Sequence, residues 1–451
     1  MLFSKQDLRK LIIPLILEQA LAITVGMADT MMISSVGEAA VSGVSLVDMY
    51  NNLVFSVLAA LATGGAVVTS QYLGAGRPEK ACRSARQLIC TAGMIAIAVM
   101  LLSVLFHRPV LRLLFGGIEA DVMQNAIIYM VISALSFPML AVYNAAAALF
   151  RSMGNSQITL KVSILMNVVN IVGNAVCIFG LHMGVAGVAL PTLISRTLAG
   201  ILLYVLLRRP ENVIRLERGR FRFDFEEVKR ILYIGIPSGI ENGIFQLGRV
   251  LVVSIIAGFG TVQIAANGVA NSLDAMDCIA GQALNLAMIA VIGRCVGAKD
   301  ETQIRHYTKK LLGMTYLFTA MTNIVILVFL PQILSLYGLG SETTKLAWTL
   351  VMIHDGIAIF LWPLSFTLPN MLRACNDVKY TMVISIFSMI TFRIGLSYIL
   401  GVQMQLMAVG VWIAMVADWI FRVICFLVRY FRGKWRVLAG VAPVETTPGK
   451  V

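Results

Sequence analysis

The chain has 451 residues, of which 59% are hydrophobic and only 13% are charged. A soluble domain carries about twice that share of charged residues, so the composition excludes an ordinary soluble protein. Apolar runs of roughly 20 residues recur along the whole chain, and each is long enough to cross a bilayer as a helix. The sequence therefore predicts an all-α polytopic membrane protein.

Twelve membrane spans are expected in chain order. They cover residues 11–34, 46–73, 88–106, 122–150, 158–180, 185–207, 229–257, 266–293, 310–331, 345–373, 378–400 and 406–430. The expected domains are an amino-terminal six-helix lobe at 1–207, a charged cytoplasmic linker at 208–228, a carboxyl-terminal six-helix lobe at 229–437, and a polar cytoplasmic tail at 438–451.

The net charge of +13 could suggest a nucleic-acid partner, but its distribution favours another cause. When the amino terminus is placed inside, the loops on the outside hold only Arg108, Arg112 and Lys345 among the lysines and arginines. Such asymmetry sets membrane topology, and it predicts a multi-pass protein of the inner cell membrane with both termini cytoplasmic. No nucleic-acid partner is expected; contact with anionic membrane lipid is.

The opening of the first span returns about half the chain later. Residues 13–19, IPLILEQ, reappear at 236–242 as IPSGIEN, and Gly37 matches Gly260. An even number of spans in each half gives both halves the same membrane orientation. The repeat predicts two pseudo-symmetric six-helix bundles that transport by alternating access.

The first span carries two acids, Glu18 and Asp29, although a carboxylate inside a membrane is costly and is by default a functional candidate. At about 100° per residue, the two lie within roughly 20° of each other on one helix face. Asn170 and Asn174 share a face of the fifth span, and Thr192 follows a proline in the sixth. Carboxylate, amide and hydroxyl oxygens suit a hard cation. Ordinary interhelical hydrogen bonding is the alternative.

The second half offers a further set of polar side chains. Glu241 and Asp355 are expected near mid-membrane, where they could hold cationic cargo together with Glu18. Gln246 and Gln282 add polar groups to this expected cavity. The alternative for Glu241 is an ion pair with Arg249.

Other polar residues are expected to have structural roles and no part in transport. Asp48, Asp418 and Arg422 lie near span ends and could snorkel to water. His354 could titrate near neutral pH, but a lone histidine is more often a packing residue. The seven cysteines form no CxxC pair, so neither a disulfide framework nor a metal site is expected. The chain holds no nucleotide P-loop and no hydrolase motif. It is therefore expected to be no enzyme and to need no cofactor, and either to draw energy from an ion gradient or to transport its substrate downhill.

Several segments together resemble the multidrug and toxic-compound extrusion (MATE) family. They are PLILEQ with GMADTMMIS, SQYLGAGRPEKA, LFRSMGNSQIT, NVVNIVGNAVCIFG, MGVAGVALPTLIS and the second-half IPSGIEN. The resemblance runs from about residue 5 to 430. It implies export of organic cations and drugs in exchange for Na⁺ or H⁺, by a monomer with two lobes around a central cavity.

The resemblance also implies roles for individual residues. Asp29 matches the family's first-span acid of the amino-terminal ion site, and Asn170, Asn174 and Thr192 match positions that accompany it. Some members carry an aspartate where this chain has Asn174, so the chain departs from them by one negative charge and the coupling ion stays open. Glu241 and Asp355 resemble carboxyl-terminal acids that take part in cation coupling or drug binding.

Two other functions remain as alternatives. An ion-coupled flippase of a lipid-linked substrate belongs to the same superfamily, but it would need several cationic side chains for a pyrophosphate, and the acids in this chain favour cationic cargo. A membrane enzyme acting on lipid would need clustered His, Asp or Cys at a membrane face, which the sequence does not offer.

Overall fold

The computed structural model describes residues 2–116, 119–216 and 222–441, and within these ranges it contains helices and no strand. The first half contains α1 (Lys5–Ser34), α2 (Glu38–Gly74), α3 (Pro78–Leu105), α4 (His107–Phe115), α5 (Ala120–Leu135), α6 (Phe137–Ser152), α7 (Ser156–Ala175), the π-helical η1 (Val176–Gly180) and α8 (Ala186–Leu207). The second half contains α9 (Phe225–Ala257), α10 (Thr261–Asp277), α11 (Ile279–Gly297), α12 (Glu301–Leu336), α13 (Ser341–Trp362), η2 (Pro363–Thr367), α14 (Leu368–Ala374), α15 (Val378–Ser388), η3 (Met389–Leu396), η4 (Tyr398–Gln403), α16 (Met407–Arg432) and α17 (Lys434–Leu438).

The membrane-spanning elements agree with the sequence prediction. In the described part of the chain, 11 helical segments are long and apolar enough to cross a membrane. The pair α5 and α6, bent by 46° just before Pro138, passes the same test when taken together and supplies the twelfth span. The predicted all-α fold with twelve spans is therefore confirmed.

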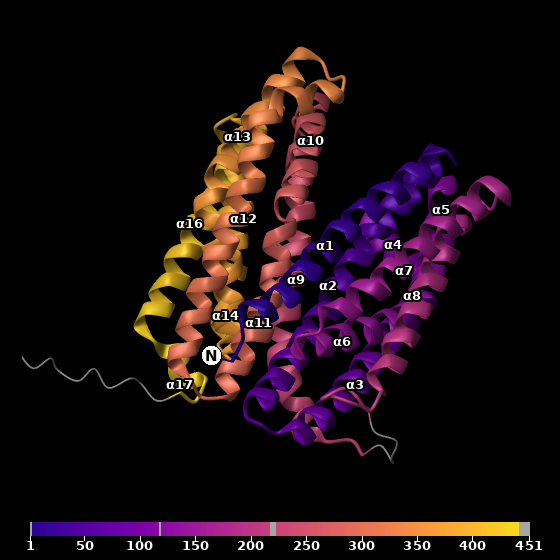
Figure 1. Cartoon of the computed structure of the whole chain (residues 1–451). Coiled ribbons are helices and arrows are strands. Elements are labelled where there is room, and N and C mark those ends of the chain that lie inside the picture. Colours follow the sequence, from indigo (N-terminus) through magenta and orange to yellow (C-terminus); the bar gives the residue numbers. More distant parts are fainter. Residues whose placement is uncertain (1, 117–118, 217–221, 442–451) are drawn as a thin grey trace, which may run out of the picture. The chain divides into compact units, whose positions relative to one another are not determined.

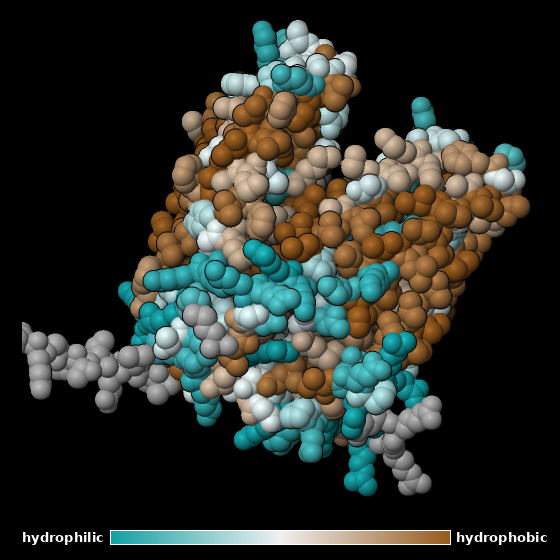
Figure 2. All heavy atoms as spheres, in the orientation of Figure 1, coloured by the Kyte–Doolittle hydropathy of each residue, from teal (hydrophilic) through white to brown (hydrophobic). Residues whose placement is uncertain are grey.

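The helices turn apolar side chains outward, as expected for contact with lipid. On α12, Leu317, Met321 and Val328 are 58%, 55% and 62% exposed. The opposite face of the same helix buries Thr315 and Asn323. Figure 2 shows apolar side chains over the long helices and hydrophilic ones gathered toward helix ends. This distribution is the reverse of a soluble protein's, and it suits a bilayer as solvent.

The chain divides into two compact units. We call Lys5–Thr69 with Arg77–Gly243 the N-unit, and Met1–Ser4 with Ser70–Gly76 and Ile244–Val451 the C-unit. The division falls inside α2 and α9, so each of these helices contributes to both units. The expected linker at 208–228 and tail at 438–451 lie partly outside the described residues, because 217–221 and 442–451 are not described.

Packing within each unit is helix against helix. In the N-unit α1 packs on α7, α3 packs on α6, and α8 packs against both α6 and α7 (Figure 1). In the C-unit α10 packs on α13, α12 packs on α11 and α13, and α13 also packs on α16. These contacts place the polar residues of α1, α7 and α8 together in one unit, and those of α10, α12 and α13 together in the other.

The sequence repeat is also a repeat of backbone conformation. Gly37 and Gly260, which precede α2 and α10, have φ of 130° and 100°, a region that glycine enters without a steric penalty. Further residues with positive φ recur at the same spacing or one residue less: Gly76 with Lys299, Gly116 with Gly338, Gly154 with Asn376, His182 with Gln405, and Gly184 with Met407. The two halves therefore turn at matching points, as two pseudo-symmetric bundles require.

One close helix crossing within the C-unit rests on two repeat-related glycines. A Cβ atom at Gly74, at the end of α2, would lie 1.9 Å from the carbonyl oxygen of Arg294. A Cβ atom at Gly297, at the end of α11, would lie 1.9 Å from the carbonyl oxygen of Gln71. Only residues without a side chain allow these two backbones to come so close, which explains the shared glycine in the repeat.

Candidate functional site

The N-unit contains a partly open cavity of about 490 Å³ among α1, α2, α5, α7 and α8. Its walls include two acids, Asp29 and Asp48, and one base, Arg196. Asn170 and Thr192 also line it. Charged side chains inside a membrane bundle usually face a cavity of this kind, which makes these three charged residues functional candidates.

The four residues predicted for an ion site are joined by one chain of hydrogen bonds. The Asn174 amide nitrogen donates to Asp29 Oδ1 at 2.7 Å and approaches Asn170 Oδ1 at 3.4 Å. The Asn170 amide nitrogen donates to Thr192 Oγ1 at 3.0 Å. Helices α1, α7 and α8 supply these side chains. The structure thus brings together Asp29, Asn170, Asn174 and Thr192.

One oxygen atom in this hydrogen-bond network, Asn174 Oδ1, accepts no hydrogen bond from the described residues. Asn174 is fully buried, and its Oδ1 atom has no hydrogen-bond partner among the described residues. A buried acceptor without a partner costs free energy unless a proton or a cation fills the gap. Beside the Asp29 carboxylate, this oxygen is a candidate ligand for a hard cation.

Three residues of the same cavity were not assigned from the sequence. Asp48, which was expected to reach water, lines the cavity and accepts a hydrogen bond of 3.0 Å from the Tyr129 hydroxyl. Arg196 donates to Ser136 Oγ at 3.1 Å, and its guanidinium lies 4.6 Å from the ring centre of Phe55. The charge of Arg196 acts on both Asp29 and Asp48. Its spacing of four residues from Thr192 on α8 was the available signal.

Glu18 does not share this arrangement with Asp29. Thr159 of α7 donates a hydrogen bond of 3.0 Å to its carboxylate, and Tyr143 of α6 donates one of 3.5 Å. The Arg151 guanidinium lies 3.9 Å from the same carboxylate. Glu18 is 8% exposed, so these contacts tie α1 to α6 and α7 inside the unit. Glu18 and Asp29 share one face of α1, but they contact different residues.

The C-unit contains a second polar cluster, centred on His354 of α13. Its Nε2 atom lies 2.8 Å from Asp274 Oδ1, and its Nδ1 atom lies 2.8 Å from Asp355 Oδ1. Ionised carboxylates only accept hydrogen bonds, so this geometry suits a ring that carries a proton on both nitrogens. His354 is therefore a central charged partner of two acids, and the expectation of a packing residue is corrected.

Asp277 of α10 completes the cluster. Thr322 of α12 donates to its Oδ1 atom at 3.1 Å, and the Asn323 amide forms a short hydrogen bond to the same atom. One ligand atom each from Asp277, His354 and Asp355 lies within 4.8 Å of the others. A doubly protonated His354 ring has no lone pair to offer a cation, so only the two carboxylates could act as ligands in this state. Three carboxylates lie around one imidazolium here, and the charges of Arg249 and Arg393 also act on Asp274.

The other residues expected in a cargo cavity are divided between the two units. Glu241 is buried in the N-unit, whereas Asp355 and Arg249 belong to the C-unit. Gln246 is partly buried and Gln282 is exposed, both in the C-unit. The structure therefore does not unite these side chains within one unit.

Two residues near the end of the last span were expected to reach water and do not. Asp418 is fully buried and accepts a short hydrogen bond from the Ser388 hydroxyl. Arg422 is 3% exposed, donates to the Ser365 carbonyl oxygen at 3.3 Å, and places its guanidinium 4.7 Å from the ring centre of Phe366. Both residues lie on the face of α16 that packs into the unit. They are therefore buried although they lie near the end of the span.

Comparisons with known proteins agree with this architecture. The model of the MatE family matches residues 14–176 and 237–399, which are the two halves of the repeat. The chain is 28% identical over 441 residues to the "Probable multidrug resistance protein NorM" of Thermotoga maritima, covering 96% of this chain and 93% of that one. It is 27% identical over 438 residues to the "Uncharacterized transporter YisQ" of Bacillus subtilis, covering 95% and 94%. A solved structure of "MATE in complex with MaD3S" shares the fold, with a TM-score of 0.89 at 18% identity and 97% of both chains covered.

Proposed function

Since the chain belongs to the MatE family, we propose that it is a secondary active antiporter that exports organic cations and drugs in exchange for Na⁺ or H⁺. Family membership confirms the resemblance seen in the sequence and makes the protein an integral membrane transporter, not an enzyme. The name of the NorM relative supports drugs as the class of cargo. The acids within both units support a positive charge on that cargo.

The observation that carries the coupling part of the proposal is the hydrogen-bond chain of the N-unit cavity. Asp29 supplies a carboxylate, and Asn174 supplies an acceptor oxygen that has no donor among the described residues. A proton on Asp29 or a Na⁺ ion beside both oxygens would neutralise this charge. We propose Asp29, Asn170, Asn174 and Thr192 as the coupling-ion site.

We further propose that the acids of the C-unit cluster help to hold the cationic cargo. Asp355 and Asp277 contribute negative charge beyond what His354 balances. The rings of Trp412 and Trp419 lie 5.7 Å and 5.2 Å from the imidazole ring, and aromatic faces attract organic cations. Glu241 of the N-unit is proposed as a second acid for cargo.

Exchange follows if ion and cargo favour opposite states of the transporter, which is the requirement for alternating access. We propose that the protein lies as a monomer in the inner cell membrane with both termini cytoplasmic, because the basic loops favour that orientation. A flippase of a lipid-linked anionic substrate is not favoured, because the N-unit cavity carries two carboxylates against one guanidinium.

Proteoliposomes test this function directly. Purified protein in sealed vesicles should move ethidium against its own gradient when a Na⁺ or pH gradient is imposed, and should stop when the gradient is collapsed by an ionophore. Comparing the two gradients identifies the coupling ion. Scrambling of a fluorescent lipid without ethidium transport would overturn the proposal in favour of the flippase.

A further inference from the structure

The short helix α4, between two spans, exposes large apolar side chains. Helix α4 follows α3 after a break at Phe106, where His107 Nδ1 lies 2.7 Å from the carbonyl oxygen of Val104. Leu111 is fully buried against the N-unit core, whereas Leu113 is 85% exposed and Leu114 is 44% exposed. A helix with outward leucines and arginines on another side is typical of one that lies at the membrane boundary.

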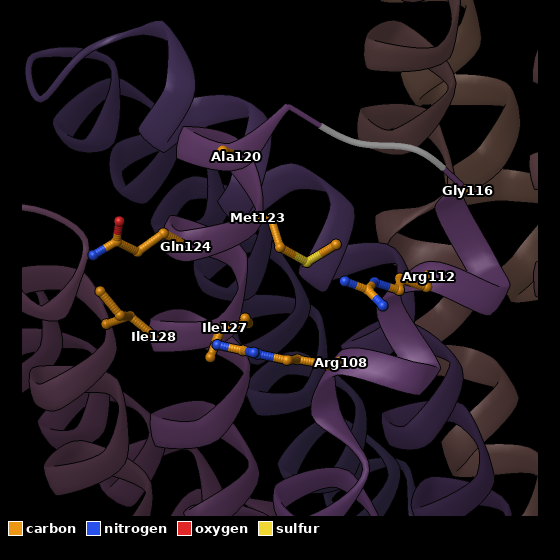
Figure 3. Close-up of a pocket in the computed structure, with 8 residues that line it drawn as sticks. All are labelled: Arg108, Arg112, Gly116, Ala120, Met123, Gln124, Ile127 and Ile128. Carbon is orange, nitrogen blue, oxygen red and sulfur yellow. The ribbon is translucent and has the colours of Figure 1, made fainter.

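A groove of about 890 Å³ separates α4 from α5 (Figure 3). Its lining residues are Arg108, Arg112 and Gly116 on one side and Ala120, Met123, Gln124, Ile127 and Ile128 on the other. The two arginines are one helical turn apart and therefore neighbours on α4. In Figure 3 the side chain of Arg108 extends toward Ile127, and that of Arg112 extends toward Met123.

The groove carries two positive charges and, among the described residues that line it, no negative one. Neither Arg108 nor Arg112 has a carboxylate partner among the described residues, and none of the groove's lining residues is acidic. Glu119 and Asp121 lie near the start of α5 but are not among them. The inside-positive charge bias does not account for these two arginines, because they lie in a loop that the topology places outside.

The chemistry of the groove identifies an anionic amphiphile. Two neighbouring guanidinium groups offer planar pairs of donors that match the oxygens of a phosphate. Met123, Ile127 and Ile128 form an apolar wall that a free phosphate ion would leave unused. We propose that this groove binds the phosphate headgroup of an anionic phospholipid, whose acyl chains lie against the apolar wall and the exposed leucines of α4.

Lipid retention measured by native mass spectrometry tests the proposal on the purified full chain. The probes are phosphatidylglycerol, phosphatidylcholine and inorganic phosphate. Each arginine near an anionic lipid should contribute about a fivefold preference, so the double variant R108Q/R112Q should retain about 25-fold less phosphatidylglycerol. The variant R108K/R112K keeps the charge but loses the paired donors, so its retention should be intermediate.

Two further variants keep the test decisive. Lys345→Gln removes the other basic residue of the outside loops and should leave retention unchanged. Gln124→Glu changes an exposed side chain to a carboxylate of the same shape within the groove, and it should lower retention without removing an arginine. Equal retention of phosphatidylglycerol by the double variant and the unmodified protein would overturn the proposal. Binding of inorganic phosphate that displaces the lipid would overturn the assignment to a phospholipid.

Discussion

Replacing His354 with glutamine removes the positive charge from the centre of the C-unit cluster. The imidazole lies 2.8 Å from one carboxylate oxygen of Asp274 and 2.8 Å from one of Asp355. Glutamine has a similar reach and can donate a hydrogen bond, but it cannot balance two carboxylates. His354 and Asp355 are each only 1% exposed, so water cannot take over that role.

The magnitude follows from the burial of the partners. Removing one member of a buried ion pair costs about 3–5 kcal/mol, because the remaining charge is left uncompensated. For a unit of this size, such a loss should lower the midpoint of thermal unfolding by roughly 10 °C. Adding Asp355→Asn in the same chain removes one of the orphaned charges, so the double variant should be more stable than His354→Gln alone.

Thermal unfolding in detergent, followed by intrinsic tryptophan fluorescence, measures both effects. His306→Gln on α12 is the matched control, because that histidine is exposed and its loss should change the midpoint little. An unchanged midpoint for His354→Gln would refute the ionic cluster, since a neutral packing histidine could be exchanged at far lower cost.

Two further predictions concern helix ends. Gly297→Ala places a methyl group where the carbonyl oxygen of Gln71 lies, and this overpacking against backbone should cost about 1–3 kcal/mol of stability. The control Gly313→Ala, whose added methyl group meets open space, should not be destabilising. Equal midpoints of thermal unfolding for the two variants would contradict the close crossing. Asp300 caps α12 by accepting hydrogen bonds from Gln303, which lower the pKa of its carboxyl group. Asp300→Ala should therefore cost about 1 kcal/mol at neutral pH, and the difference should shrink as the pH falls through that lowered pKa; a pH-independent difference would contradict a charged cap.

Much of the fold could be predicted from the sequence because hydropathy and repetition are strong signals. Most expected spans coincide with one helical segment or a bent helix pair, whereas the span expected at 266–293 runs across two helices, α10 and α11. The match of Gly37 with Gly260 anticipates two backbone turns of the same kind. The helical spacing of Asn170 and Asn174 predicts a shared face, and in the structure the two side chains approach each other at 3.4 Å, with Asn174 bonded to Asp29 of α1 and Asn170 to Thr192 of α8. Local periodicity carries such information within a single helix.

Other features depend on which helices pack together, and local patterns do not carry that information. His354 contacts Asp274 only because α13 packs on α10. The two residues lie far apart in the sequence. Asp418 and Arg422 looked like span-end residues, yet the packing of α16 buries both. The short helix α4 was hidden in a loop, because a nine-residue amphipathic segment is too short to read as a span.

The central claim is that Asp29 couples transport to an ion gradient. Asp29→Asn preserves the shape of the side chain and removes its charge, and Asp121→Asn removes an exposed acid at the start of α5 as a control. Both variants, reconstituted in liposomes and normalised to folded protein, are compared for ethidium efflux with and without a Na⁺ or pH gradient. The account predicts that Asp29→Asn folds and binds ethidium but no longer responds to either gradient, while Asp121→Asn responds normally. Gradient-dependent efflux at the unmodified rate in Asp29→Asn would contradict it.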